Sequence, residues 1–184
     1  MALSPVRSGG CSCSMAIVCV IMWLATEAGF SVAMSRVHES RQAPAFTLND
    51  QHQAAHHYQF PRCKISVLIF ADYAGSSQLE NWIRPLFERY QERIAIDGVA
   101  DLSRAPKLIR GMVRAAFRDR LERPVMLDWS GAVSTDYHDQ KGQANLLVID
   151  HSGRILLKIV GAISAAKVQR VQNVIDQQLN VNRP

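Results

Sequence analysis

The cysteines offer the widest chemistry in this chain, because a thiolate is both a nucleophile and a metal ligand. Four are present: Cys11, Cys13, Cys19 and Cys63. The first three precede residue 20, in a segment with the character of an export signal, so a processed chain keeps only Cys63. A single thiol forms no intramolecular disulfide, and the paired C-x-x-C motifs of a zinc site are missing from the sequence. The cysteines therefore exclude a disulfide framework and a cysteine-based metal site.

Three aspartates end the segments that are predicted to be parallel strands: Asp72, Asp101 and Asp128. The carboxyl ends of parallel strands meet at one edge of a sheet, where open α/β proteins place their ligands. One alternative is that the three carboxylates form a hard-cation site or an acid–base site. The other alternative is structural, because aspartate commonly begins turns and caps helices. We favour the structural role.

Ser77 stands where a helix is predicted to begin, and Glu80 follows three residues later in a capping-box pattern. A helix N-terminus favours anions, so an oxyanion or phosphate site is one interpretation of Ser77. As a nucleophile, Ser77 would need a base, for which His138 is the candidate. A simple capping role explains the same residues without catalysis. The adjacent pair His56 and His57 favours a solvated turn over a metal site, because neighbouring strand residues point to opposite faces.

The first 33 residues resemble a secretory signal peptide. Arg7 supplies a positive start, an apolar run follows at residues 15–25, and small residues up to Ala33 favour cleavage after that position. The alternative is an N-terminal membrane anchor, which Glu27 disfavours because it interrupts the apolar run early. We therefore predict signal peptide 1–33 and an exported protein, either periplasmic or secreted.

The rest of the chain is long enough for one well-buried core. Residues 34–44 are polar and predict a flexible lead, and residues 45–184 predict one α/β domain. The β-branched run at 65–71 is typical of a strand buried on both faces. Two long crossovers make the first three strands parallel, and a hairpin adds antiparallel strands, so we expect a mixed central sheet with helices on both faces. The expected order is strand, helix, strand, helix, strand, hairpin and helix, at 65–71, 77–93, 94–100, 105–122, 125–127, 146–160 and 165–179.

This order and three short motifs resemble the redoxin branch of the thioredoxin-like superfamily, which includes peroxiredoxins and exported thioredoxin-like reductases. The motifs are A-P-A-F-T-L-N-D at 43–50, D-Y-A-G-S-S at 72–77 and L-V-I-D-H-S-G-R-I at 147–155. They are similar to the family's opening A-P-x-F-x-L-x-D, to the W-C-G-P-C that follows its central strand, and to its hairpin F-L-I-D-x-D-G-x-I. The resemblance covers about residues 43–179 and implies a thioredoxin-like fold.

The sequence departs from the family pattern at the positions that carry the family's redox chemistry. By the resemblance, Ala74 stands at the nucleophilic cysteine and Ser77 at the resolving cysteine. Dithiol exchange needs both thiols, and a thiol peroxidase needs a cysteine of low pKa at the same helix N-terminus. Cys63 precedes the central strand and so lies at the end opposite to this site. The positions that the resemblance implies for the redox site are Tyr73, Ala74, Gly75, Ser76, Ser77 and Ala144, the last of these near the family's cis-proline.

The predicted helix at 105–122 carries most of the charge asymmetry. Between residues 104 and 123 the chain has seven Lys or Arg, six of them Arg, and two Asp or Glu, so this region alone has the net charge of +5 of the whole chain. We expect a basic stripe along one helix face, opposite an apolar side that packs on the sheet. The stripe is either an ordinary solvated face or a surface for an anionic partner, an acidic protein or an acidic membrane. Nucleic acid is disfavoured for an exported protein without a nucleic-acid-binding motif. The expected stripe consists of Lys107, Arg110, Arg114 and Arg118.

Three functions remain open at this point. The first is an exported thioredoxin-fold protein without its own redox dithiol, a binding or accessory module that acts through the former active-site face or the basic helix. The second is a redoxin-family oxidoreductase or peroxidase, which the resemblance suggests and these residues do not support. The third is a ligand-binding or metal-binding protein that uses the aspartates at the sheet edge. We favour the first and expect no cofactor.

Overall fold

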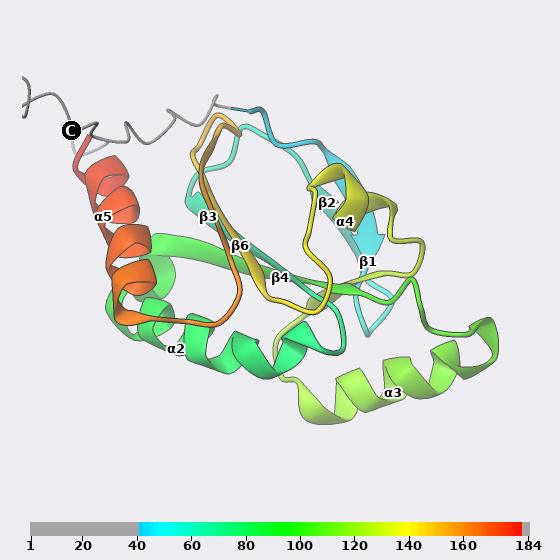
Figure 1. Ribbon diagram of the computed structural model, residues 1–184. Helices are drawn as coiled ribbons and strands as arrows, with labels where there is room; N and C mark the ends of the chain where they lie inside the picture. The colour runs from blue at the N-terminus through cyan, green and yellow to red at the C-terminus, as the bar shows by residue number, and fades with distance from the viewer. Residues whose placement is uncertain (1–40, 182–184) are drawn as a thin grey trace, which may run out of the picture. The chain divides into compact units, whose positions relative to one another are not determined.

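The computed structural model describes residues 41–181, so the predicted signal peptide and most of the predicted lead lie outside the described residues. No helix within residues 41–181 is both long enough and apolar enough to cross a membrane. Figure 1 shows the order of the elements. These are β1 (Phe46–Asn49), β2 (Ala55–Tyr58), β3 (Ile65–Ala71), η1 (Gly75–Gln78), α2 (Leu79–Tyr90), η2 (Gln91–Arg93), β4 (Ile94–Asp101), η3 (Lys107–Ile109), α3 (Arg110–Arg120), β5 (Val125–Asp128), α4 (Ala132–Asp136), β6 (Asn145–Ile149), β7 (Ile155–Val160) and α5 (Ala165–Val181).

The central sheet has five strands in the order β5-β4-β3-β6-β7. β3 pairs in parallel with β4 and antiparallel with β6, so that Val67 lies between Ile96 and Val148. β4 and β5 are also parallel, and β6 and β7 are antiparallel. All seven residues of β3 are buried, as its β-branched sequence predicts for a strand with both faces covered. The predicted mixed α/β sheet is therefore confirmed.

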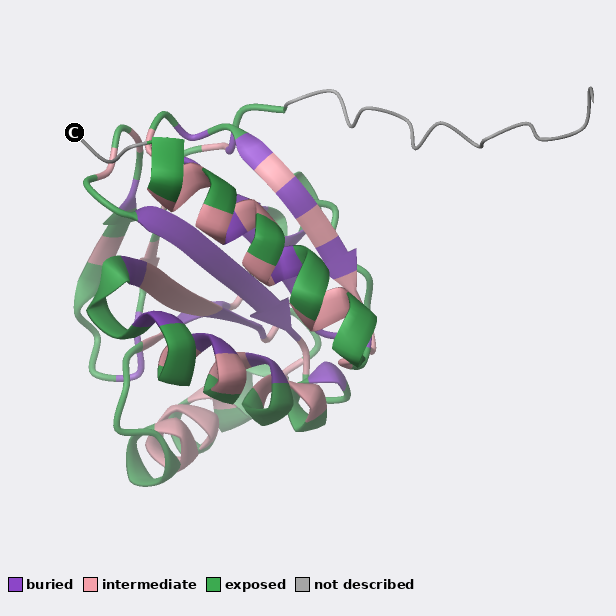
Figure 2. Cartoon of the chain, turned by 90° about the vertical axis from the view of Figure 1, so that its left-hand side faces the viewer, coloured by how far each residue is buried: buried purple, intermediate pink, exposed green. Residues whose placement is uncertain are grey.

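Helices α2 and α5 cover one face of this sheet, and their buried residues turn toward it (Figure 2). Trp82 and Leu86 of α2 and Val171 of α5 belong to one apolar cluster with β3, β6 and β7. The Trp82 indole N–H donates a 2.9 Å hydrogen bond to the carbonyl oxygen of Gly161. Its large ring is thereby fully buried with its one polar group satisfied.

The opposite face is covered by the antiparallel β1–β2 hairpin and the short helix α4. Tyr137, just after α4, packs on Phe70 of β3 with ring centroids 5.0 Å apart, and its hydroxyl donates to the carbonyl oxygen of Pro44 at 2.6 Å. Gln42 forms a bridge with Arg154, and Ala43 is buried. Residues 41–44 are thus part of the fold, which corrects their assignment to a flexible lead.

Helix α3 does not pack against the sheet in the way that the sequence predicted. None of its residues is buried (Figure 2), and the side chains of Leu108 and Met112 are 99% and 74% exposed. The prediction that the apolar side of this helix packs on the sheet is therefore wrong. The segment after β1 lies along the outer edge of β5, where Asp50 forms a bridge with Met126.

The connection from β3 to α2 packs tightly on the loop that precedes β6. A side-chain carbon placed on Gly75 would lie 2.6 Å from the backbone carbon of Gln143, closer than any van der Waals contact allows. Gly111, in the first turn of α3, has no atom within 4 Å of the same position. The two glycines therefore offer a matched pair of substitutions.

We predict opposite effects of alanine at these two glycines on the free energy of unfolding. Gly75→Ala should lower it by about 1–3 kcal/mol, because backbone must move to make room. Gly111→Ala should raise it by about 0.5–1 kcal/mol, because alanine loses less entropy than glycine in an exposed helix. Urea denaturation followed by circular dichroism measures both values, and a stabilised Gly75→Ala variant would contradict the close approach.

Candidate functional site

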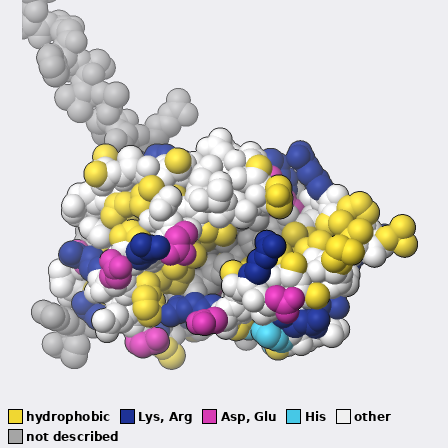
Figure 3. All heavy atoms as spheres, turned by 90° about the horizontal axis from the view of Figure 1, so that it is seen from below, with side chains coloured by type: hydrophobic (Ala, Val, Ile, Leu, Met, Phe, Trp, Pro, Cys, Tyr) yellow, Lys and Arg dark blue, Asp and Glu magenta, His cyan; other side chains and the backbone are white. Residues whose placement is uncertain are grey.

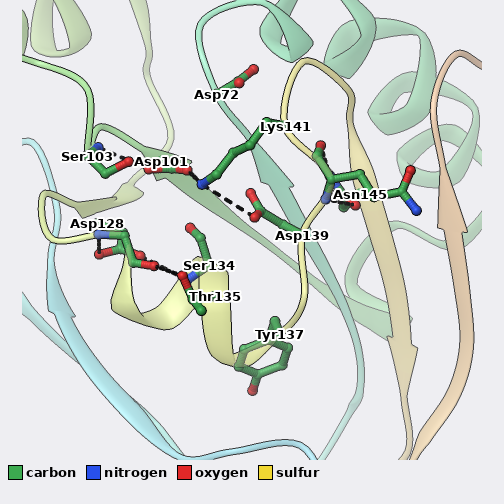
Figure 4. Close-up of polar contacts among 12 residues, drawn as sticks. Asp72, Asp101, Ser103, Asp128, Ser134, Thr135, Tyr137, Asp139, Lys141 and Asn145 are labelled. Atoms are coloured by element: carbon green, nitrogen blue, oxygen red, sulfur yellow. Dashed lines mark hydrogen bonds and ion pairs between the residues drawn. The ribbon is translucent and has the colours of Figure 1, made fainter.

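A cluster of polar side chains lies at the edge of the sheet where β3, β4 and β5 end (Figure 4). Asp72 follows β3 and accepts two hydrogen bonds of 2.8 Å, one from the backbone N–H of Gly75 and one from that of Gly142. Its carboxylate thereby joins η1 to the loop before β6. In the same place the N–H of Ala144 donates to the side-chain oxygen of Gln78 at 3.1 Å. The structure thus brings residues 72–78 and Ala144 together.

The predicted capping box at the start of α2 is not formed. The Ser77 hydroxyl lies 3.4 Å from the carbonyl oxygen of Ala74, and Glu80 pairs with Arg84 at 2.6 Å. The chain enters α2 through the 3₁₀ turn η1, so the first free N–H is that of Gly75, which Asp72 accepts. No hydrogen bond joins Ser77 to His138 within residues 41–181, so the structure gives the serine no base.

The buried aspartates at this edge serve as acceptors for backbone N–H groups. Asp128 is fully buried and accepts from the N–H of Gly131 at 2.7 Å and from that of Ser134 at 2.9 Å, which caps α4. Asp101 accepts from the N–H of Ser103 at 2.9 Å and pairs with the ammonium group of Lys141. These contacts favour the structural interpretation of the aspartates.

The arrangement does not suit a metal ion. Figure 4 shows Asp72, Asp101 and Asp128 as separate side chains, and each accepts hydrogen bonds from a different set of N–H groups. Within residues 41–181, no three His, Cys, Asp or Glu side chains are grouped so that they would hold a metal ion. The oxygen atoms of these three aspartates are already occupied by N–H and ammonium donors, which disfavours the alternative of a hard-cation site.

Two carboxyl groups at this edge have pKa values shifted in opposite directions. For Asp139, burial raises the pKa; Lys158 acts against this, and the charges of Asp72 and Asp128 add to it. For Asp72, burial acts upward but is outweighed by the hydrogen bonds from Gly75 and Gly142, so its pKa is lowered. Asp72 is therefore held as a carboxylate, whereas the burial of Asp139 favours its protonated form.

The arrangement of these elements matches many solved structures. One is the pneumococcal exposed lipoprotein thioredoxin from Streptococcus pneumoniae, with a TM-score of 0.58 and 13% identity over 71% of this chain and 99% of that chain. Another, from Chlorobium tepidum, is assigned as a thiol:disulfide interchange protein DsbE, with a TM-score of 0.56 and 22% identity over 74% and 95% of the two chains. The chain has a thioredoxin-like fold. No protein-family model and no curated protein matches it.

A third similar structure is the thioredoxin domain of a thiol-disulfide oxidoreductase from Bacteroides vulgatus, with a TM-score of 0.54 and 17% identity. It aligns over 74% of this chain and 96% of that chain. The likeness thus extends over nearly the whole of each of these three domains. At these identities it establishes the fold, and the chemistry of this chain has to be argued from its own residues.

In this thioredoxin-like domain the cysteine and the 72–78 segment lie at opposite ends of β3. Cys63 is exposed, is free of any disulfide and precedes the strand, whereas Ala74 and Ser77 follow it. Seven residues of extended strand separate the two ends by roughly 23 Å. Tyr73 beside Ala74 is 94% exposed, so this segment faces solvent. Within residues 41–181 the exposed end of β3 therefore has no cysteine sulfur atom within reach.

The four cations predicted to form one stripe on α3 and η3 are divided between two surfaces. Lys107 and Arg118 are exposed, whereas Arg110 and Arg114 turn inward against Trp129, with guanidinium carbons 5.1 and 5.9 Å from the ring centroid. The prediction of a single solvent-facing stripe is therefore wrong. A planar guanidinium stacks favourably on an indole face, and the helix rotates to make this contact instead of burying its apolar side.

We predict that Asp72→Asn lowers the free energy of unfolding by about 2 kcal/mol at pH 7, because hydrogen bonds to a charged acceptor are lost and the new amide faces an N–H group. The pKa of Asp72 is lower in the folded protein than its ordinary value of 3.8. The Asp72 carboxylate therefore contributes fully to the free energy of unfolding above pH 3.8, and this contribution is lost as the pH falls through the lower pKa of the folded state. Urea denaturation at pH 7 and pH 3 should show the difference from the wild type shrinking at pH 3. Asp119→Asn, on the exposed side of α3, is the control; a difference independent of pH would contradict the role of the charge.

Proposed function

We propose that this chain is an exported thioredoxin-fold binding module without a redox dithiol of its own. The proposal rests on the exposed turn after β3, where the resemblance to the redoxin family assigns Ala74 and Ser77 to the positions of the family's two cysteines. The one cysteine of residues 41–181, Cys63, lies at the other end of the strand. A thioredoxin-like fold that keeps the turn and lacks the thiols retains a surface for recognition.

Export is supported by the signal-like character of residues 1–33. It is also in keeping with two of the similar structures, of which one is an exposed lipoprotein thioredoxin and the other a protein assigned as DsbE. We propose a periplasmic or secreted location on these grounds. In an oxidising compartment a chain with one remaining thiol keeps that thiol unpaired or joins it to another molecule.

The surface that we propose for partner binding is the outer patch, which consists of Leu108, Ile109 and Met112. Figure 3 shows hydrophobic side chains gathered at the side of the molecule where α3 lies. Lys107 and Arg118 are exposed on the same segment. Exposed apolar side chains beside cations are typical of surfaces that contact an anionic membrane or an acidic protein. We therefore propose an anionic surface as the partner of the outer patch.

A redoxin-family oxidoreductase is the second candidate, because thiol-disulfide oxidoreductases are among the similar structures. Within residues 41–181 it would have to use Cys63 alone, without a resolving thiol. Such an enzyme forms a mixed disulfide and then stops unless a second molecule supplies the thiol. A measurement of catalytic turnover therefore distinguishes the binding module from the oxidoreductase.

We predict that residues 34–184 show no turnover in insulin reduction or in peroxide consumption. The variant Ala74→Cys/Ser77→Cys should form an internal disulfide under mild oxidation, because both positions are exposed and one turn apart at the start of a helix. Tyr73→Cys/Ser77→Cys is the matched control. Mass spectrometry after alkylation measures the disulfide. Turnover by the wild type would contradict the proposal, and failure of the designed pair to crosslink would contradict the placement of the two positions.

We predict that residues 34–184 sediment with anionic vesicles and not with neutral ones, and that added salt weakens this binding. Lys107→Glu/Arg118→Glu should weaken it at least tenfold, because each cation near an anionic leaflet contributes about 1 kcal/mol. Arg93→Glu/Arg170→Glu makes the same change of charge away from α3 and should bind like the wild type. Binding that is the same for all three proteins would contradict the membrane version. A pull-down profile from exporting cells that is unchanged by Lys107→Glu/Arg118→Glu would contradict the protein version.

A further inference from the structure

A cavity of about 300 Å³ lies beneath α3, on the side of the helix away from the outer patch. The β1 strand and the turn that follows it form one wall, and β5 with the residues after it forms the other. Thr47, Asn49 and Ser130 at its rim are exposed, so the cavity is open to solvent. Its size is at the lower end of the range of small-molecule sites. The lining residues are Thr47, Leu48, Asn49, Asp50, Arg114, Leu127, Trp129 and Ser130.

The cavity is positively charged on the side of α3. Arg114 lines it directly, and Arg110 lies beside it and donates to the carbonyl oxygen of Trp129 at 3.2 Å. The Nε atoms of both arginines are buried and have no hydrogen-bond partner. Within residues 41–181 neither guanidinium forms an ion pair with a carboxylate. Buried N–H donors without an acceptor are uncommon in folded proteins and are satisfied when an acceptor enters.

The carboxylate in the lining does not neutralise these arginines. One oxygen of Asp50 accepts from the N–H groups of His52 and Ala54, at 2.8 and 3.0 Å. The other oxygen is 2.8 Å from the Nε2 atom of His56. Asp50 thus directs both oxygens into its own hairpin. The charge of Arg114 remains available to a ligand.

The rest of the lining defines the kind of anion. Leu127 is buried, and Leu48 and the indole ring of Trp129 complete an apolar wall. A guanidinium fork next to such a wall fits a planar carboxylate attached to an apolar body, because the fork binds the two oxygens and the wall covers the carbon atoms. A free inorganic oxyanion would leave the apolar wall exposed to water. The shape and polarity together favour an organic anion.

We propose that this cavity binds a small organic carboxylate, with the acid group held by Arg114 and the apolar body packed against Trp129 and Leu127. This site is separate from the turn after β3 and from the outer patch, so it is independent of the proposed function above. A ligand here connects α3 to β1 and β5. Binding therefore holds in place the one helix of the described domain, α3, that spans more than two turns and buries no side chain.

The experiment uses uniformly ¹⁵N-labelled protein of residues 34–184 and benzoate as the probe. The indole N–H resonance of Trp129, assigned with Trp129→Phe, should shift saturably with benzoate. Arg114→Gln should weaken the apparent affinity at least tenfold, and Arg110→Gln should also weaken it. Arg118→Gln, one turn further along the same helix and exposed, should bind like the wild type.

Each possible outcome of this experiment either supports or overturns the proposal. The remaining resonances show whether a variant keeps its fold, and substitution on α3 leaves the core in place because no α3 residue is buried. The proposal is overturned if the Trp129 resonance does not shift saturably, or if the shift persists unchanged in a folded Arg114→Gln. It is also overturned if inorganic phosphate binds as tightly as benzoate, since the apolar wall would then contribute nothing.

Discussion

The domain depends on the burial of β3 between β4 and β6. Every side chain of this strand is buried, on both faces of the sheet, so both faces must be covered. Burying each large apolar side chain contributes about 1.5–3 kcal/mol, and five of the seven buried residues of this strand are of that kind: Ile65, Val67, Leu68, Ile69 and Phe70. α2 and α5 cover one face, and the β1–β2 hairpin with α4 covers the other. The positions of all loops at the sheet edge follow from this arrangement.

The carboxylates at the edge connect those loops through hydrogen bonds and an ion pair. Asp72 joins η1 to the loop before β6, Asp128 caps α4, and Asp101 pairs with Lys141. In this chain the acceptors at this edge are already paired, and the turn at residues 72–78 contains no sulfur atom.

Elements with a strong local signal could be predicted from the sequence. β3 was marked by a run of β-branched residues, and α2 and α5 by apolar residues at helical spacing. The hairpin β6–β7 was marked by Gly153 in its turn, which has a positive φ. The five residues of α4 had no such signal, because this helix depends on a buried cap by Asp128 and on Gly131 with a φ of 74°. Short elements held by distant side chains leave no periodic pattern.

The orientation of α3 could not be predicted for a related reason. Helical spacing separated the basic positions from the apolar ones, but which side of the helix turns inward depends on the segments that surround it. The β1–β2 hairpin takes the place beside β5, and Trp129 then offers a ring to the arginines. Because the orientation of α3 was not predicted, the cavity that Arg114 lines was not predicted either. A tryptophan directly after a strand-ending aspartate, near an arginine-rich helix, was the available signal.

That α3 buries no side chain also bears on how this protein can change over evolutionary time. Core positions are constrained by packing, so their substitutions are mostly removed by selection on stability. The exposed positions on α3 are nearly free of that constraint. Their composition can drift, or adapt to a new partner, while the sheet beneath stays folded. The exposed arginines of this helix, Arg118 and Arg120, are therefore not required by packing, and any selection that maintains them acts on what they contact.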